Sequence, residues 1–337
     1  MTAVDGGARV AVFGAAGYTG ALAARLLHRH PYFQLQTVTA RSDVGRRLSD
    51  LYPHHRVPLS LEELDLDAQA ADLDAAVVAY PHGAAAELVA DLRHRRVRVV
   101  DLSADFRLRD LGTYEEWYRP HPAPELLDTA VYGLPELYRE QVETADLVAN
   151  PGCYPTATIL ALAPLAEAGL IDEVIVDAKS GASGAGRGAS DKTHFVTVDE
   201  NVSAYGVPRH RHTPEIEQEL AALGAETTIT FTPHLLPLDQ GELVSCYVTT
   251  RHKPEDLQGL YHDFYAAEAF VEVADQPPGV RDVRETNVCR ISVHSDERTG
   301  RTIVFGAIDN LWKGSSSQAV QNLNLMFGRP EAEGIAP

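Results

Sequence analysis

The first half of the chain alternates short apolar runs with amphipathic segments, and this alternation restricts the folds that it can adopt. The run Arg9–Phe13 is followed by Tyr18–Arg29, in which Leu22, Leu26 and Leu27 recur at helical spacing. Strands that alternate with helices form a parallel sheet covered by those helices. We therefore expect an α/β domain over residues 1–152. The pattern continues with strand-like and helix-like segments at Leu35–Ala40, Asp74–Ala79, Ala84–Arg93 and Val97–Asp101.

The order of predicted elements changes after residue 152, where strand-like runs follow one another with few helices between them. Consecutive strands of this kind predict a second domain of the α+β type with a mixed, largely antiparallel sheet. One clear helix, Pro254–Tyr265, carries an apolar stripe at helical spacing, and another is expected at about Ser316–Phe327. The predicted strands are Glu173–Ala178, Glu226–Phe231, Glu242–Thr249, Val288–Ser295 and Thr302–Ile308.

Length and charge limit the partners of the protein. A chain of 337 residues exceeds one typical domain. The formal net charge of −19 repels phosphate backbones and anionic lipids, so we expect no nucleic acid and no membrane as partners. No apolar run approaches the roughly 20 residues that span a bilayer, and the start, MTAVDGGARVAVFG, lacks the apolar core of a signal peptide. We expect a cytoplasmic protein whose three cysteines stay reduced.

A glycine-rich turn follows the first predicted strand and opens the first predicted helix. Glycines there let the backbone approach a pyrophosphate, whose charge the helix N-terminus attracts. The spacing is G-x-x-G-x-x-G rather than G-x-G-x-x-G, so a tight turn without a ligand is the alternative. Its place at the start of an alternating domain favours a Rossmann-type nucleotide-binding domain. The candidate cofactor residues in this turn are Gly14, Ala16, Gly17, Tyr18, Thr19 and Gly20.

The end of the second predicted strand bears on the choice of cofactor. An NAD site usually has an Asp or Glu there to hold the ribose 2′-hydroxyl. This chain has Arg41 and Ser42 instead, a cation and a donor that suit a 2′-phosphate. A solvated arginine in a surface loop is the alternative, because arginine is common on surfaces. The pattern favours NADP(H).

Cys153 lies in the stretch NPGCYPT, between a glycine-containing turn and an apolar helix. Pro155 suits the first turn of that helix, so we expect the sulfur at a helix N-terminus. The positive end of the helix dipole and the free N–H groups lower a thiol pKa there, and the same N–H groups can hold an oxyanion. Free cysteines are more often packing residues, but such a residue would lie within the apolar run. We interpret Cys153 as a nucleophile, and Cys246 and Cys289 as core residues.

The stretch YGVPRHRHTPEI contains the candidate proton donor and acceptor. A nucleophilic thiol beside a nicotinamide needs such a group, and histidine is the best suited side chain. One histidine of this stretch would serve, while neighbouring arginines such as Arg211 would bind an anionic substrate. A metal site through His210 and His212 is the alternative. No CxxC or HExxH pattern accompanies them, so we expect no metal.

Two further segments are candidates for ligand binding. The glycine-rich loop KSGASGAGR follows a predicted strand, and its backbone donors would wrap a phosphate or a cofactor amide. A plain connector is the alternative. This loop makes Ser183 and Gly184 candidate cofactor residues and Arg187 a candidate substrate residue. Arg107 follows the strand at Val97–Asp101 and is expected at the carboxyl edge of the sheet, where ligands bind in such folds.

A series of motifs resembles the N-acetyl-gamma-glutamyl-phosphate reductases of arginine biosynthesis. The match runs from about residue 8 to 328, and the combination of GCYPT with HRHTPEI is its specific part. The motifs, in chain order, are GAAGYTG, PHG, VVDLSADFRL, YGLPE, NPGCYPTA, SGASGAGR, HRHTPEI and AIDNLWKG.

The resemblance implies an NADPH-dependent oxidoreductase that acts on a small-molecule acyl phosphate. It reduces N-acetyl-glutamyl 5-phosphate to the semialdehyde, releases phosphate and passes through a thioester. The resemblance implies Cys153 as the nucleophile, His210 as the acid/base and Tyr205 as a pocket residue. We expect the phosphate and the α-carboxylate of the substrate to bind among Arg107, Arg187 and Arg211.

The resemblance also bears on cofactor contacts, domains and assembly. It places Asn310 beside the cofactor, together with Pro81 of the PHG motif. It returns the last helix to the first domain, so residues 311–337 complete residues 1–152, and residues 153–310 form the catalytic domain. It implies a homodimer or homotetramer assembled through that second domain.

The alternatives to this activity are a related reductase and proteins of two other classes. The related reductase of lysine biosynthesis acts on a carrier-protein-linked aminoadipyl phosphate, but it tends to carry Asn-Ala where this chain has Tyr154 and Pro155. A non-catalytic NADP-sensing protein would leave Cys153 and His210 without a catalytic role. A Cys-His hydrolase would not bind NADPH.

Overall fold

The computed structural model describes residues 6–252 and 255–336, which form two compact units. Unit 1 extends to Pro151 and includes Ser315–Ala336, and unit 2 comprises Gly152–Gly314. Gly152 and residues 311–314 thus belong to unit 2, whereas the sequence analysis assigned them to the first domain. Pro254, which begins a predicted helix, lies outside the described residues, as do residues 1–5 and 337.

Unit 1 contains a six-stranded sheet in which every neighbouring pair is parallel. Its order is β2-β1-β3-β4-β6-β5, which confirms the expected Rossmann-type sheet. The chain order changes direction at β1, which lies between β2 and β3, and ligands bind beyond the strand ends at such a point. The strands are β1 (Arg9–Phe13), β2 (Gln34–Thr39), β3 (Ala75–Val78), β4 (Arg98–Asp101), β5 (Val131–Tyr132) and β6 (Leu147–Ala149).

Helices pack on this sheet because successive strand residues point to opposite faces and both faces are apolar. Ala11, Phe13, Ala76 and Val78 share one buried cluster with helix α4 (Ala86–His94). The last helix, α11, contacts both α1 and α6. The helices of unit 1 are α1 (Tyr18–Arg29), α2 (Leu48–Leu51), α3 (Leu66–Gln69), α4, α5 (Leu111–Trp117), α6 (Pro135–Thr144) and α11 (Ser317–Met326).

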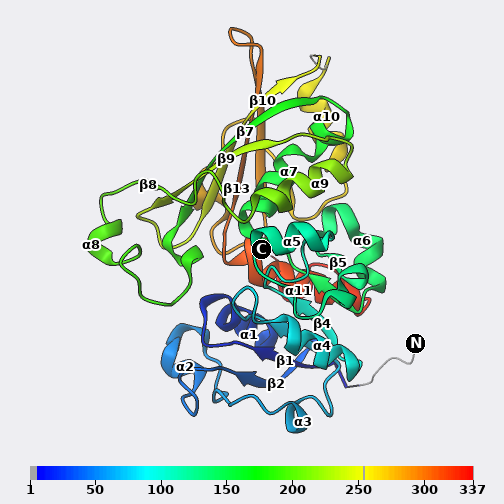
Figure 1. The fold of residues 1–337 in the computed structure, drawn as a ribbon, viewed down its shortest axis with the longest axis vertical. Helices are drawn as coiled ribbons and strands as arrows, with labels where there is room; N and C mark the ends of the chain where they lie inside the picture. The colour runs from blue at the N-terminus through cyan, green and yellow to red at the C-terminus, as the bar shows by residue number, and fades with distance from the viewer. Residues whose placement is uncertain (1–5, 253–254, 337) are drawn as a thin grey trace. The chain divides into compact units, whose positions relative to one another are not determined.

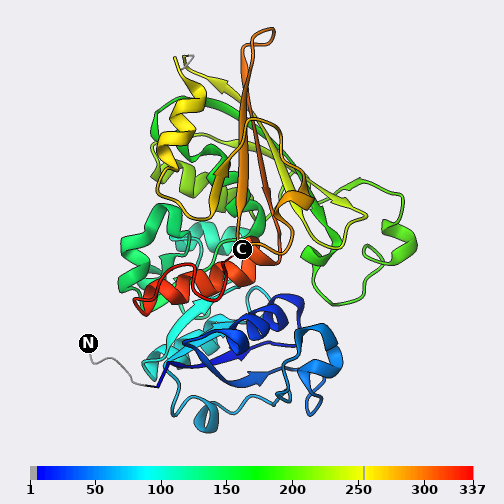
Figure 2. The same ribbon diagram turned by 180° about the vertical axis from the view of Figure 1, so that it is seen from behind.

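Unit 2 contains a seven-stranded mixed sheet of order β11-β12-β13-β10-β7-β9-β8. Its neighbours are antiparallel except for β11 with β12 and β7 with β9, which confirms the expected mixed, largely antiparallel sheet. Figure 2 shows the β12–β13 hairpin, in orange, as a long ribbon. The strands are β7 (Ile171–Gly181), β8 (Ser203–Ala204), β9 (Ile229–Leu236), β10 (Glu242–Thr250), β11 (Val271–Val273), β12 (Cys289–Asp296) and β13 (Arg301–Ile308).

Helix α7 (Cys153–Glu167) lies against strands β10 and β13 and beside α9 (Thr213–Ala222), as Figure 1 shows. Gly306 of β13 makes this contact close, because a Cβ atom there would lie 3.0 Å from the carbonyl oxygen of Ala157. Helix α9 was not predicted, nor were the short strands β5, β6, β8 and β11. Two other helices, α8 (Phe195–Val198) and α10 (Leu257–Phe264), complete unit 2 as far as it is described. Over residues 6–252 and 255–336, no helix has the length and apolar character that a bilayer crossing requires.

Candidate active site

Cys153 is the first residue of α7, and its side chain is half-buried. The preceding residue, Gly152, is extended, with φ −67° and ψ 156°, and its backbone N–H donates to Oε1 of Glu215 at 2.9 Å. A Cβ atom on Gly314 would lie only 2.8 Å from the Cβ atom of Cys153, so the chain passes close to the cysteine there. The hydrogen bond to Glu215 therefore holds the turn before Cys153, and the segment at Gly314 packs closely against the cysteine side chain.

The N-terminus of α7 receives no side-chain cap from its N-cap residue, Gly152. The backbone N–H of Thr156 donates to the carbonyl oxygen of Gly152 at 2.9 Å and Pro155 has no N–H, so the backbone donors at the very start of the helix are those of Cys153 and Tyr154. Every residue from Tyr154 to Ala166 is buried, and burial against the sheet rather than a cap holds the helix in place. The structure therefore confirms the predicted position of Cys153 at a helix N-terminus.

An aromatic cluster surrounds the residue that follows the cysteine. The ring of Tyr154 contacts those of His210 and Phe231, with centroid distances of 5.7 and 5.3 Å. Tyr205 donates its hydroxyl to the hydroxyl oxygen of Tyr154 at 3.0 Å, and its ring lies 5.6 Å from that of His210. Burial raises the pKa of both tyrosines, so both hydroxyls stay protonated. Cys153, Tyr205 and His210, which the sequence analysis selected, thus belong to one neighbourhood.

His210 is a neutral imidazole at physiological pH. Burial, with the positive charge of Arg211 as a second cause, lowers its pKa from 6.5 to about 4. The backbone N–H of His212 donates to Nδ1 of His210 at 3.2 Å, which assigns the ring proton to Nε2. His210 therefore presents a hydrogen-bond donor from Nε2, while Arg211 is exposed beside it.

Asn310 is hydrogen-bonded to Ser183, another residue that the sequence analysis selected, within unit 2. Its Nδ2 donates to Oγ of Ser183 at 3.0 Å, and its Oδ1 accepts from the backbone N–H of Gly241 at 2.7 Å. Ser183 and Asn310 are buried, whereas Gly184 and Arg187 are exposed on the same glycine-rich loop. Asn310 thereby ties this loop to the start of β10.

The glycine turn of unit 1 fits a phosphate. Gly14 has φ +95°, and a Cβ atom there would lie 2.5 Å from the carbonyl oxygen of Ala79, at the end of β3. Gly20 likewise has no room for a Cβ atom, which would collide with Gly14. A Cβ atom on Gly17 would lie at an ordinary contact distance of 3.8 Å from the carbonyl oxygen of Gly14, and Gly17 caps α1 without a side-chain hydrogen bond. Gly14 and Ala15 donate their backbone N–H groups to the carbonyl oxygen of Thr39, so the donors that this turn offers to a phosphate are those of the first turn of α1. Ala16 lies in this turn, and Tyr18 and Thr19 begin α1.

A pocket beside this turn carries two arginines. Arg41 follows β2, and its guanidinium carbon lies 4.9 Å from the ring centroid of Tyr80. Arg119, which the sequence analysis did not select, lines the same pocket, and so does the carboxylate of Glu87. Ser42 and Pro81 are exposed at the ends of β2 and β3. The complete lining is Arg41, Gly83, Ala84, Glu87, Arg119 and Pro122.

Arg107 is buried within unit 1 and supports the chain that precedes the cysteine. Its Nε donates to the carbonyl oxygen of Asn150 at 2.7 Å, and its Nη2 donates to that of Leu102 at 2.8 Å. The backbone N–H of Asn150 also donates to the carbonyl oxygen of Asp101 at 2.8 Å. Arg107 thus anchors the segment before Gly152, and it is buried, whereas Arg187 and Arg211 are exposed.

Asp105, two residues before Arg107, fixes the loop between β3 and α4. Its carboxylate accepts from the backbone N–H of Gly83 at 2.5 Å and from those of Ala85 and Ala86 at 3.1 Å. The hydroxyl of Tyr114 donates to the same carboxylate at 3.1 Å. The motif VVDLSADFRL therefore shapes one wall of the two-arginine pocket.

Two protein families match the two halves of the chain. The family described as semialdehyde dehydrogenase, NAD binding domain, matches residues 9–145, and the one described as semialdehyde dehydrogenase, dimerisation domain, matches residues 153–310. Together with the fold and the glycine turn, they define the class of protein. It is an oxidoreductase of the semialdehyde dehydrogenase type that uses a nicotinamide cofactor.

Curated relatives narrow this class. The chain is 51% identical to the N-acetyl-gamma-glutamyl-phosphate reductase of Desulforudis audaxviator (strain MP104C), over 97% of each chain. It is 48% identical to the N-acetyl-gamma-glutamyl-phosphate reductase of Syntrophobacter fumaroxidans (strain DSM 10017 / MPOB), again over 97% of each chain. The chain belongs to the N-acetyl-gamma-glutamyl-phosphate reductase family, and the resemblance seen in its motifs is confirmed.

Solved structures share the fold at low sequence identity. Aspartate semialdehyde dehydrogenase II from Vibrio cholerae, complexed with ASA, aligns with a TM-score of 0.72 and 18% identity over 96% of this chain and 98% of that one. Aspartate semialdehyde dehydrogenase with NADP from Candida albicans aligns with a TM-score of 0.72 and 15% identity over 95% and 98%. At these identities the likeness concerns the fold alone.

Proposed function

We propose that the protein catalyses the NADPH-dependent reduction of N-acetyl-L-glutamyl 5-phosphate to N-acetyl-L-glutamate 5-semialdehyde, in the cytoplasm, through a thioester on Cys153. The observation that carries this proposal is the place of Cys153. It is a half-buried thiol at an uncapped helix N-terminus, one residue from a tyrosine that contacts His210. The names of the curated relatives support the choice of substrate.

The chain's own residues have four tasks in this reaction. The thiolate of Cys153 attacks the acyl carbon, a C–S bond forms, and the C–O bond to phosphate breaks. The N–H groups at the start of α7 hold the oxyanion. Nε2–H of His210 donates to an oxygen of the reacting group. Tyr154 and Tyr205, joined by their hydroxyls, keep that imidazole in position. The nicotinamide, when bound, supplies the hydride that reduces the thioester.

For the cofactor we propose NADP(H), held by the glycine turn and by residues at the ends of β2 and β3. Arg41 and Ser42 provide a cation and a donor for the 2′-phosphate, and Arg119 adds a second cation in the same pocket. The carboxylate of Glu87 opposes them, so the pocket has one net positive charge. Pro81, Ser183, Gly184 and Asn310 remain proposed cofactor contacts.

For the substrate anions we propose Arg187 and Arg211, both exposed on loops of unit 2. Both guanidinium groups can form paired hydrogen bonds with a phosphate or a carboxylate. Arg107 has a positioning role in this proposal, because two of its nitrogens donate to backbone carbonyls before Gly152.

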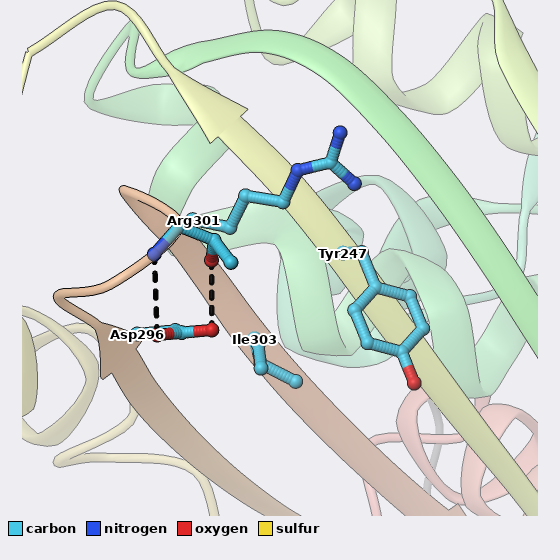
Figure 3. Close-up of a pocket in the computed structure, with 5 residues that line it drawn as sticks. Tyr247, Asp296, Arg301 and Ile303 are labelled. Atoms are coloured by element: carbon cyan, nitrogen blue, oxygen red, sulfur yellow. Dashed lines mark hydrogen bonds between the residues drawn. The ribbon is translucent and has the colours of Figure 1, made fainter.

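We further propose a homodimer or homotetramer assembled through the open face of the unit 2 sheet. Tyr247 of β10 and Ile303 of β13 are cross-strand neighbours, and both side chains are half-buried. They line a hollow with Asp296, Thr299 and Arg301, shown in Figure 3. Apolar side chains on one face of a sheet are stabilised when a partner covers them. The match to a dimerisation domain supports this assignment.

The test of the activity is the reverse reaction, phosphate- and NADP+-dependent oxidation of N-acetylglutamate semialdehyde. We expect activity in the wild type and none in Cys153→Ala. Activity that survives in this variant contradicts the thioester route. Reduction of a carrier-linked aminoadipyl phosphate in preference to the acetylglutamyl phosphate would assign the chain to the lysine-type reaction instead.

A further inference from the structure

Glu242 is a carboxyl group in an apolar environment. It begins β10 and lies on the same strand face as Val244, Cys246 and Val248, and its side chain is fully buried. Its neighbours across the sheet are Ser180 of β7 and Ile308 of β13. A carboxylate at such a position loses its hydration without gaining a counter-charge.

Neither carboxyl oxygen of Glu242 has a described partner at full hydrogen-bond geometry. Burial raises the pKa of Glu242 from 4.5 to about 8. The nearby Cys153 and Ser180 act in the opposite direction through hydrogen bonding, and Asp309 raises the pKa further. Desolvation prevails, so the group is a neutral acid at pH 7. It therefore has a proton to donate.

Three observations place this carboxyl near the nucleophile. Cys153 is near enough to form a hydrogen bond with Glu242. A Cβ atom on Gly314 would lie 2.8 Å from Cβ of Cys153 and 3.2 Å from Cδ1 of Ile308, the strand neighbour of Glu242. The carboxyl also acts electrostatically on the hydroxyls of Tyr154 and Tyr205. The titratable groups that face it are thus Cys153, Asp309 and these two tyrosines.

We propose that Glu242 is a further catalytic residue, a neutral carboxylic acid that donates a hydrogen bond to Sγ of Cys153 and stabilises the thiolate. The inference rests on the proposed function, in which Cys153 is the nucleophile. The thiol loses its proton to solvent, and Glu242 keeps its own proton and directs it at the sulfur. A buried carboxylic acid kept neutral at pH 7 is an effective donor to a developing anion.

This role complements that of His210. Nδ1 of His210 accepts from a backbone N–H, and Nε2 carries the ring proton. In that form the imidazole is a donor toward the reacting group and not an acceptor for the thiol proton. The sulfur therefore relies on the first turn of α7 and on Glu242 for stabilisation of its charge.

The test measures the rate at which iodoacetamide alkylates Cys153 in the full-length protein, as a function of pH and without substrate or cofactor. Cys246 and Cys289 are fully buried, and Cys153→Ala provides the background rate. At pH 7 we expect Glu242→Leu to react about tenfold more slowly than the wild type, because a hydrogen bond to an ion changes a pKa by about one unit. Glu242→Gln keeps a neutral donor and should retain the wild-type rate.

The pH profile separates this role from a structural one. Near pH 8 the carboxyl of the wild-type protein ionises, and its negative charge then disfavours the thiolate. The alkylation rate of the wild type should therefore rise with pH in two steps, whereas that of Glu242→Gln should follow a single titration. Identical profiles for wild type and Glu242→Gln would overturn the proposal, and so would a wild-type rate in Glu242→Leu. If Glu242→Leu does not fold, the comparison with Glu242→Gln decides. Because no substrate is used, failure here is distinct from failure of the proposed reaction.

Discussion

The backbone N–H of Gly152 donates to Oε1 of Glu215 at 2.9 Å, one residue before the nucleophile. Glu215 lies in the first turn of α9 and is buried, so this bond joins the start of α7 to a second helix of unit 2. Glu215→Ala would leave a buried N–H without its acceptor, which costs about 1–3 kcal/mol. We expect a matching loss in the free energy of unfolding by urea and slower alkylation of Cys153. Glu215→Gln keeps an acceptor and should lie close to the wild type; equal stability of all three proteins would contradict this role.

His210 should make the protein less stable in acid. Its pKa falls from 6.5 to about 4 on folding, so between these values the unfolded chain binds a proton that the folded chain does not. The stability provided by the neutral imidazole is complete above pH 6.5 and declines as the pH falls toward 4. We expect the difference in Tm between pH 7 and pH 5 to shrink in His210→Gln, after comparison with His94→Gln as a control on the surface of unit 1. An equal difference in wild type and His210→Gln would refute it.

Arg119 should contribute to the choice between the two nicotinamide cofactors. Arg119→Ser removes one of the two cations in the pocket with Arg41, and we expect the Kd for NADP+ to rise about tenfold, since a charge-assisted hydrogen bond is worth about 1.5 kcal/mol. The Kd for NAD+ should not change. Arg95→Ser, at the exposed C-terminal end of α4, is the matched control. Parallel weakening of both cofactors, measured by calorimetry, would exclude a 2′-phosphate contact.

Asp105 should be essential to the stability of unit 1. Its carboxylate accepts three backbone N–H groups at the start of α4, and it is fully buried. Asp105→Ala leaves these donors unsatisfied, and we expect a loss of about 3 kcal/mol in the free energy of unfolding. Asp110→Ala is a suitable comparison, because Asp110 caps α5 in the same way at an exposed site. A smaller loss for Asp105→Ala than for Asp110→Ala would count against this view.

Ile303 should govern assembly. Ile303→Asp places a charge on the open sheet face next to Tyr247, where burial against a partner would require its desolvation. We expect sedimentation to show a monomer for this variant and a larger species for the wild type. Thr144→Asp, at the exposed end of α6 (Pro135–Thr144) in unit 1, should leave the assembly unchanged.

The long elements of the fold were predictable because their patterns are local. The apolar run Arg9–Phe13 and the leucine spacing of Tyr18–Arg29 match β1 and α1 in both bounds. Strands β5 and β8 have two residues each, too few for a periodic pattern, and only their neighbours in the sheet define them. Helix α9 had a local signal, a proline in its first turn and Glu215 after it, but HRHTPEI was interpreted for its chemistry alone.

The candidate site could be predicted where a single motif defines a residue. Cys153 and His210 followed from their motifs, whereas Arg119 is remote in sequence from Arg41, and only the fold brings both to one pocket. Glu242 had a usable signal. Val244, Cys246 and Val248 alternate along the strand, and the same alternation two residues earlier places a carboxyl on the buried face. A carboxyl residue in register with a core strand is a candidate functional group.

The contact at Gly306 has a consequence for how this enzyme can vary. Main-chain atoms of α7 rest almost directly on the main chain of β13, with only a hydrogen atom of the glycine between them. The distance between the sulfur of Cys153 and the sheet therefore depends on the separation of the α7 and β13 backbones and hardly on side-chain size. Substitutions of other side chains around the sulfur can therefore change its surroundings while the distance between the reactive atom and the sheet stays constant.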